Sequence, residues 1–194
     1  MKKLKIVLLA LLLILVGCSS KDEKVESSFS KTSQDIWGEI IINDTDKITV
    51  PTTLKELGDD YSYVGYPVSV EGYKLITTSI QKEGHQRILV SVVEDDEEEI
   101  DEDSTIGRFA FYSNQGSSVS VCGIKIGDER DKIYSALGEP DKVIEKKANE
   151  GEILYYYGGR YTDRQYILFN ITDKKVKTLE VSYLPDEYLK EEGK

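Results

Sequence analysis

The chain has 194 residues, with 36 acidic and 25 basic side chains and a formal net charge of −11. This negative charge argues against nucleic-acid binding, because binding to phosphates needs clustered Lys and Arg. Two cysteines cannot form a disulfide scaffold, and no Cys/His spacing indicates zinc. A single histidine excludes any mechanism that needs two imidazoles. The length allows one domain or two small ones, and we expect no metal and no cofactor.

Residues 1–17 have the form of a secretory signal peptide. Lysines precede an unbroken apolar run over residues 6–16, which is too short to span a membrane because about 20 apolar residues are needed. The run ends at Leu15-Val16-Gly17-Cys18, which resembles the lipobox of bacterial lipoproteins. That resemblance implies cleavage before Cys18 and a lipid such as palmitate on it. The alternative is an ordinary signal peptide with an incidental cysteine.

Residues 18–35 are rich in Ser, Lys and acidic side chains. Such a segment cannot bury enough apolar surface to offset its ordering entropy, so we predict a flexible, lipid-anchored tether. Removal of residues 1–17 leaves 177 residues with a formal charge of −14. We therefore expect a body held by acyl chains at the extracytoplasmic face of a cell membrane and repelled by anionic lipid.

Residues 36–113 are predicted to form an N-terminal α+β half. Thr53 and Glu56 have the spacing of a capping box, and Gly58 follows where a helix C-terminus favours a left-handed residue, so a very short helix is expected between them. Strands are predicted from β-branched and aromatic runs at residues 40–42, 63–70, 73–80, 86–93 and 106–112.

Nine of the ten residues in the run 94–103 are acidic, and only Ile100 interrupts them. The spacing and central glycine of a calcium-binding EF-hand loop are absent. Because runs of like charge repel one another into solvent, we predict an exposed loop without a tight ion site. The alternative is a cation site or a surface that attracts a basic partner.

Residues 114–194 are predicted to form a second α+β half. Ile133 and Leu137 have helical spacing after Asp128, which is expected to be the N-cap of a helix over residues 129–137. Apolar residues between 119 and 126 suggest strand, and a meander is predicted at residues 153–157, 165–171 and 176–183.

The two halves resemble each other. Ile48-x-Val50 with a helix that ends at Leu57-Gly58 corresponds to Ile124-x-Ile126 with a helix that ends at Leu137-Gly138. The second interval is four residues longer, about one helical turn, so the buried face of the helix is kept. We expect an α+β fold with short helices packed on one face of an antiparallel sheet, in two degenerate tandem half-repeats. Chance agreement of short apolar segments is the alternative.

Residues 123–183 carry a resemblance to a known family. Gly123-Ile124-Lys125-Ile126-Gly127-Asp128, then Leu137-Gly138-Glu139-Pro140-Asp141, then Tyr155-Tyr156-Tyr157 resemble the SmpA/OmlA pattern of small lipoproteins tied to outer-membrane β-barrel assembly. The pattern is also similar to the tandem modules of the β-lactamase inhibitor protein. These resemblances imply helices on one sheet face and a binding surface on the other. The chain is longer than the assembly lipoproteins, and its Tyr-rich, acidic body is more like Gram-positive surface lipoproteins, so the assembly role is not carried over.

Few residues suggest catalysis, and we do not expect an enzyme. His85 lies in a glycine-containing hairpin turn, where an exposed side chain is expected. Cys122 is expected to be a small buried group on a strand. Carboxylate pairs carry no signal in so acidic a chain.

The tyrosines carry the remaining signal, because thirteen are present. Strand alternation directs Tyr155 and Tyr157 to one face and Tyr156 to the other. We therefore predict a binding face that includes Tyr155, Tyr157, Tyr161 and Tyr166, since tyrosine offers rigid area with a polar tip. Sheet propensity alone is the alternative explanation.

The expected function is a lipid-anchored binding protein that recognises another protein, of inhibitor, immunity or envelope-assembly type. A cell-envelope enzyme or enzyme accessory with a carboxylate-lined site is the alternative, and a structural spacer without a specific partner is a third reading. A shallow open sheet would favour binding, whereas a deep pocket with a carboxylate of raised pKa would favour the enzyme.

Overall fold

The computed structural model describes residues 40–71, 73–94, 96–115, 118–147, 150–157 and 165–184. The predicted signal peptide, Cys18, the tether and Tyr161 lie outside the described residues. Among the residues described, no helix is long and apolar enough to cross a membrane.

The N-terminal half contains β1 (Ile40–Ile42), β2 (Asp46–Ile48), β3 (Thr52–Thr53), α3 (Leu54–Leu57), β4 (Tyr61–Ser69), β5 (Ile76–Lys82), β6 (Ile88–Val93), the 3₁₀ helix η1 (Glu97–Glu99) and β7 (Thr105–Tyr112). The C-terminal half contains the 3₁₀ helix η2 (Ser113–Gln115), β8 (Val119–Val121), β9 (Ile124–Lys125), α4 (Arg130–Leu137), β10 (Lys142–Glu145), β11 (Glu152–Tyr156), β12 (Gln165–Thr172) and β13 (Lys175–Tyr183). The predicted α+β fold with an antiparallel sheet is confirmed. The strand β10 was not predicted.

The described strands form two sheets. The large sheet has the order β10-β11-β12-β13-β7-β6-β5-β4, and β3 pairs with β7 beside this path. The small sheet has the order β2-β1-β8-β9. Every pairing between these strands is antiparallel.

The order of elements repeats between the halves, as the sequence predicted. In each half a short hairpin, β1–β2 or β8–β9, precedes a helix and then four strands in a meander. Strands in corresponding positions join the halves, since β7 pairs with β13 and β1 pairs with β8. Both sheets therefore run through both halves, and the two half-repeats share one core.

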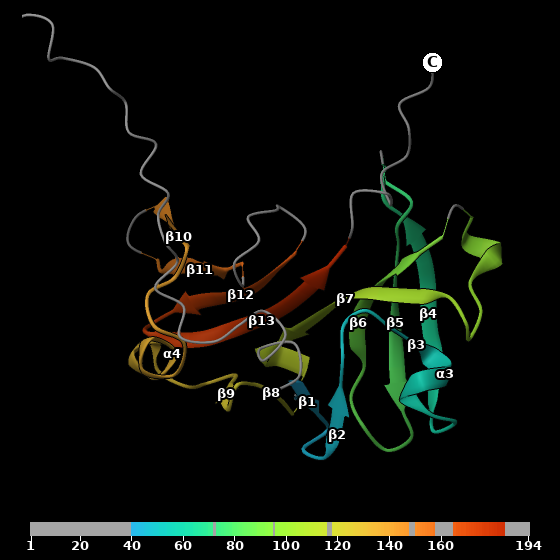
Figure 1. The fold of residues 1–194 in the computed structure, drawn as a ribbon, viewed down its shortest axis with the longest axis horizontal. Helices are drawn as coiled ribbons and strands as arrows, with labels where there is room; N and C mark the ends of the chain where they lie inside the picture. The colour runs from blue at the N-terminus through green and yellow to red at the C-terminus, as the bar shows by residue number, and fades with distance from the viewer. Residues whose placement is uncertain are drawn as a thin grey trace, which may run out of the picture.

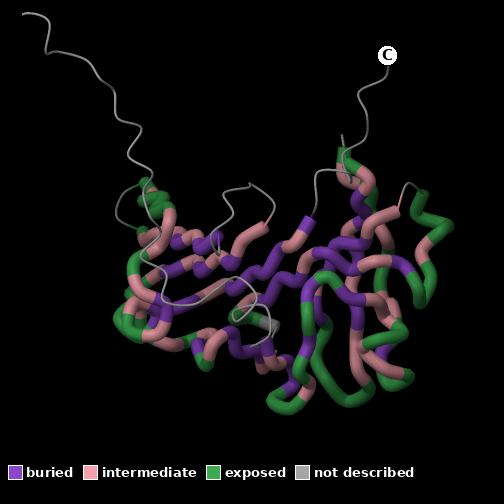
Figure 2. The backbone as a smooth tube through the Cα atoms, viewed as in Figure 1, coloured by how far each residue is buried: buried purple, intermediate pink, exposed green. Residues whose placement is uncertain are grey.

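That core lies between the large sheet and a layer made by the small sheet and α4. In Figure 1 α4 and the small sheet lie below β11, β12 and β13. Figure 2 shows buried backbone running along these strands and through the facing small sheet. The fully buried side chains that meet there include Phe109, Phe111, Leu154, Phe169, Leu179 and Val181 of the large sheet, Ile40, Ile42 and Ile124 of the small sheet, and Ile133 and Leu137 of α4.

Helix α3 is short and well capped. Thr53 and Glu56 form the predicted capping box, and Gly58 has a positive φ of 106° at the C-cap. The helix buries no residue completely; Leu54 and Leu57 are only partly buried against the core. In α4 the N-cap is Glu129 rather than the predicted Asp128, whose carboxylate instead accepts hydrogen bonds from Lys125 N and Lys132 Nζ.

The acidic run forms an exposed loop, as predicted, but it is tied to its neighbours more closely than a purely solvated loop would be. The described acidic residues from 96 to 103 are exposed, whereas Ile100 packs against the core. The Oε1 atom of Glu97 accepts hydrogen bonds from the backbone N and the Oγ of Ser69, at 2.8 and 2.7 Å. Lys55 forms an ion pair with Asp103 at 2.9 Å.

Candidate binding face

One side of the large sheet faces the core, and neither α-helix of the described chain lies on the other side. We call this other side the open face. Its residues alternate with core residues along each strand and are mostly half-buried, as a partly covered sheet surface requires. In the C-terminal half it is formed by Lys142, Ile144, Ile153, Tyr155, Tyr166, Leu168 and Asn170. In the N-terminal half it carries Val64, Thr77, Ser79, Leu89 and Ser91.

Aromatic rings gather on the C-terminal part of the open face. The rings of Tyr155 and Tyr166 meet edge to face with centroids 5.5 Å apart, and the ring of Tyr157 stacks on that of Tyr155 at 6.0 Å. The Nζ atom of Lys142 lies 5.7 Å from the centroid of the Tyr155 ring. Three of the four tyrosines predicted for the binding face are thus adjacent, and Tyr161 lies outside the described residues.

Tyr157 requires a correction. Its ring lies on the same side as Tyr155, as predicted, but only 3% of the residue is exposed. Its backbone N also donates to Oδ2 of Asp141 at 2.8 Å. Strand alternation determines the side to which a residue points and not how deeply its neighbours cover it. Tyr156 points into the core as predicted, where its hydroxyl donates to the carbonyl of Gly138 at 3.0 Å.

An ion pair lies in the middle of the open face, where β7 meets β13. Arg108 Nε and Nη2 donate to the two carboxylate oxygens of Glu180 at 2.8 and 2.7 Å. The hydroxyl of Tyr166 donates to the same carboxylate. Burial opposes the charge of Arg108, but the hydrogen bonds that Arg108 donates to Glu180 and the negative charge of Glu180 raise the pKa of Arg108. Burial is the main cause that raises the pKa of Tyr166, and the charge of Glu180 raises it further. The Tyr166 hydroxyl therefore stays protonated at neutral pH.

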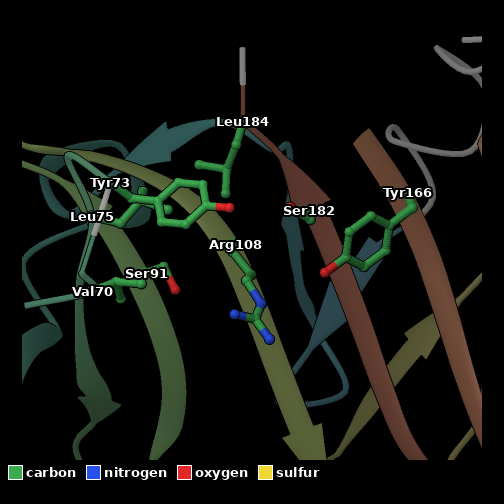
Figure 3. A pocket seen from close by; sticks show the side chains of 8 residues that line it. All are labelled: Val70, Tyr73, Leu75, Ser91, Arg108, Tyr166, Ser182 and Leu184. Carbon is green, nitrogen blue, oxygen red and sulfur yellow. The ribbon is translucent and has the colours of Figure 1, made fainter. Parts of the chain in front are cut away.

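A depression of ≈ 170 Å³ opens above this ion pair. Figure 3 shows the hydroxyl groups of Tyr73 and Tyr166 pointing inward from opposite sides, with the guanidinium of Arg108 between them and Leu184 at the rim. Val70 and Leu75 add apolar wall. An apolar cavity of about 150 Å³ holds one benzene ring, so the depression has the size of a single side chain.

Sequence reasoning missed Arg108, Glu180 and Tyr73 as parts of this face. A usable signal existed for the first two, because Arg108 is the lone charge of an apolar strand run and Glu180 lies between the apolar residues Leu179 and Val181. Such a charge must find a partner, since a buried unpaired charge is costly. Tyr73 gave no such signal, because a loop places it beside the depression.

The remaining candidates do not combine into a catalytic site. His85 is exposed in the turn between β5 and β6, as predicted. Cys122 lies in the β8–β9 turn with a positive φ of 52° and intermediate exposure, so the prediction of a buried strand position was wrong. In the described part of the chain, no group of three or more His, Cys, Asp or Glu is placed to hold a metal ion.

Carboxylates line one wide hollow, of ≈ 480 Å³, with Asp59, Asp60 and Glu83 among its residues. The hollow is open to solvent, because the side chain of Asp60 is 76% exposed.

Two carboxylates outside this hollow have shifted pKa values. Hydrogen bonds from Tyr61 and Lys82 lower the pKa of Asp46 to about 2, and a hydrogen bond from Ser118 lowers the pKa of Asp44. These shifts run opposite to what a general acid needs.

No family model, no curated protein and no solved structure matches the chain. The SmpA/OmlA resemblance therefore stays a prediction from its residues, and the geometry of the open face carries the functional argument.

Proposed function

We propose that the chain is a lipid-anchored extracytoplasmic protein that binds another protein through the open face of the C-terminal half. The observation that carries the proposal is the group formed by Tyr155, Tyr166 and Lys142, which lies on a side of the sheet that neither α-helix of the described residues covers. Tyrosine is enriched at protein interfaces because its ring gives rigid contact area and its hydroxyl a polar tip.

The shape of the face also supports protein binding. The depression above Arg108 has room for one side chain of a partner, and residues of both halves line it. Interface hot spots are commonly of this kind, with an anchor side chain in a pocket and aromatic residues around it. Small-molecule sites are usually larger and more enclosed, at about 300–1,000 Å³.

Anchoring and location belong to the same proposal and rest on the sequence. The lipobox-like residues Leu15 to Cys18 follow a short apolar run, and an acylated Cys18 would hold the body outside the cytoplasm on a bacterial surface. An inhibitor or immunity-type role is proposed by analogy with the modules that residues 123–183 resemble. A cell-envelope enzyme is the less supported alternative, because its carboxylate-lined hollow is open to solvent.

Site-specific photo-crosslinking on intact cells tests the proposal. A photoreactive phenylalanine analogue replaces Tyr155 in the full-length protein, and a matched variant carries it at Lys132. The Lys132 side chain is 49% exposed on α4, on the covered side of the sheet. We expect a discrete protein adduct from position 155 that is absent from position 132 and is lost when Tyr166→Ala is added. The same adducts from both positions would contradict the proposal.

A further inference from the structure

The two half-repeats differ strongly in charge. Residues 36–113 contain seventeen acidic and six basic side chains, whereas residues 114–194 contain fifteen acidic and thirteen basic side chains. Most of the net negative charge therefore lies in the N-terminal half, although both halves contribute strands to one continuous sheet. A partner that approaches the open face meets a nearly neutral half beside a strongly acidic one.

Two lysines give the nearly neutral C-terminal half a positive rim on its open face. Lys142 is exposed and lies over the Tyr155 ring, with Nζ 5.7 Å from the ring centroid. Lys146 Nζ donates to Asn170 Oδ1 at 2.5 Å and to Thr172 Oγ1 at 3.2 Å. Neither ammonium group forms an ion pair with a carboxylate among the described residues. Glu180, on the same face, is already paired with Arg108.

We propose that the partner segment recognised by this face is acidic: a stretch of polypeptide whose carboxylates meet Lys142 and Lys146 while its apolar side chains cover Tyr155 and Tyr166. The inference rests on the proposed function and specifies the chemistry of the partner. Both cations are already positioned, Lys146 by neutral hydrogen-bond acceptors and Lys142 by a ring face, so binding a carboxylate neutralises them without breaking an ion pair.

The charge of the other half sets the orientation. An acidic segment is repelled by the N-terminal half and attracted by the lysine rim, so it is directed to one end of the sheet. The same repulsion opposes dimerisation through this face and adsorption to an anionic bilayer, because each would bring more negative charge to an already acidic body.

A random peptide library provides the probe. The full-length protein is immobilised and panned against twelve-residue peptides displayed on phage, and enriched peptides are synthesised for affinity measurements. We expect enriched sequences to combine Asp or Glu with apolar residues. Binding should weaken about 10-fold or more in Lys142→Glu/Lys146→Glu, which converts two attractions into repulsions, and it should also weaken as salt concentration rises.

The matched control is Lys47→Glu/Lys125→Glu, which changes the net charge equally but on the small sheet, away from the open face. This variant should bind the selected peptides within about 2-fold of wild type, because screening weakens distant charges. Equal weakening by both double variants would overturn the inference, since the net charge and not the lysine rim would then govern binding. Enriched peptides without acidic residues would overturn it as well.

The tyrosines separate this inference from the proposed function. If Tyr155→Ala abolishes binding of the selected peptides while the Lys142/Lys146 variant binds normally, the face binds peptides but the acidic specificity is wrong. If neither change affects binding, both the face and its specificity are wrong.

Discussion

Arg108 and Glu180 form a bidentate ion pair between β7 and β13, the strands that join the two half-repeats in the large sheet. The Glu180 side chain is only 8% exposed, whereas the Arg108 side chain is 36% exposed and lines the depression. A buried ion pair of this kind adds no more stability than well-packed apolar residues of the same volume. The pair nevertheless places a guanidinium at the centre of the open face, where a partner can reach it.

Replacement of Glu180 by Gln should destabilise the fold. The substitution leaves Arg108 half-buried without its counter-charge, so we expect a loss of about 1–3 kcal/mol in the free energy of unfolding, measured by urea denaturation. The double variant Arg108→Met/Glu180→Leu should recover most of that loss. A double variant that is less stable than Glu180→Gln would contradict the view that the pair is dispensable for stability.

The three consecutive tyrosines should respond differently to truncation. Tyr156→Ala and Tyr157→Ala each remove a buried aromatic side chain, and we expect losses of about 3–5 kcal/mol. Tyr155→Ala, at a half-buried position, should cost about 1 kcal/mol. Chemical denaturation of the single variants measures these differences. A stable Tyr157→Ala variant would show that the ring is not part of the packed structure.

Asp46 should make stability depend on pH in acid. Its carboxylate accepts hydrogen bonds from the Tyr61 hydroxyl at 2.7 Å and Lys82 Nζ at 2.9 Å, which lower its pKa from 3.8 to about 2. Because the folded-state pKa is the lower one, the stabilisation is complete above pH 4 and is lost as pH falls towards 2. Wild type should exceed Asp46→Asn by about 1–2 kcal/mol in the free energy of unfolding at pH 6, and most of that difference should be lost by about pH 2. A difference that stays constant over this range would contradict the assignment.

The sequence predicted secondary-structure elements well where the residues that determine an element lie close together in the chain. The capping box of Thr53 and Glu56 was correct because both partners lie within one turn of chain. The half-repeat was visible because an apolar pair followed by a helix that ends at Leu-Gly occurs twice, whereas the hairpin that begins each half was not predicted. Strand β10 was missed because all four of its residues are exposed, so no buried alternation marks it in the sequence.

The candidate site was less predictable, because it depends on contacts between distant residues. Tyr155 and Tyr166 were predicted from composition and alternation. The position of Arg108 beside Glu180 depends on the pairing of β7 with β13, which are 72 residues apart at that point. The burial of Tyr157 likewise depends on tertiary cover that a strand pattern does not contain.

The lipid anchor is tested separately. If Cys18 is acylated, cells grown with a clickable fatty-acid analogue should label the wild-type protein and leave Cys18→Ser unlabelled. The variant should also appear in the soluble fraction, because it lacks the acyl chains that hold the body at the membrane. Equal labelling of both proteins would contradict the lipoprotein assignment.

The most direct test of the binding face is the affinity of the partner captured from position 155, measured with wild type and Tyr155→Ala. At an interface hot spot, the truncation should cost about 2 kcal/mol or more, which corresponds to about 30-fold weaker binding. Stability should change by only about 1 kcal/mol, and Lys132→Ala on α4 should bind like wild type. Unchanged affinity for Tyr155→Ala, together with weakened binding for Lys132→Ala, would place the interface on the covered side and contradict the account.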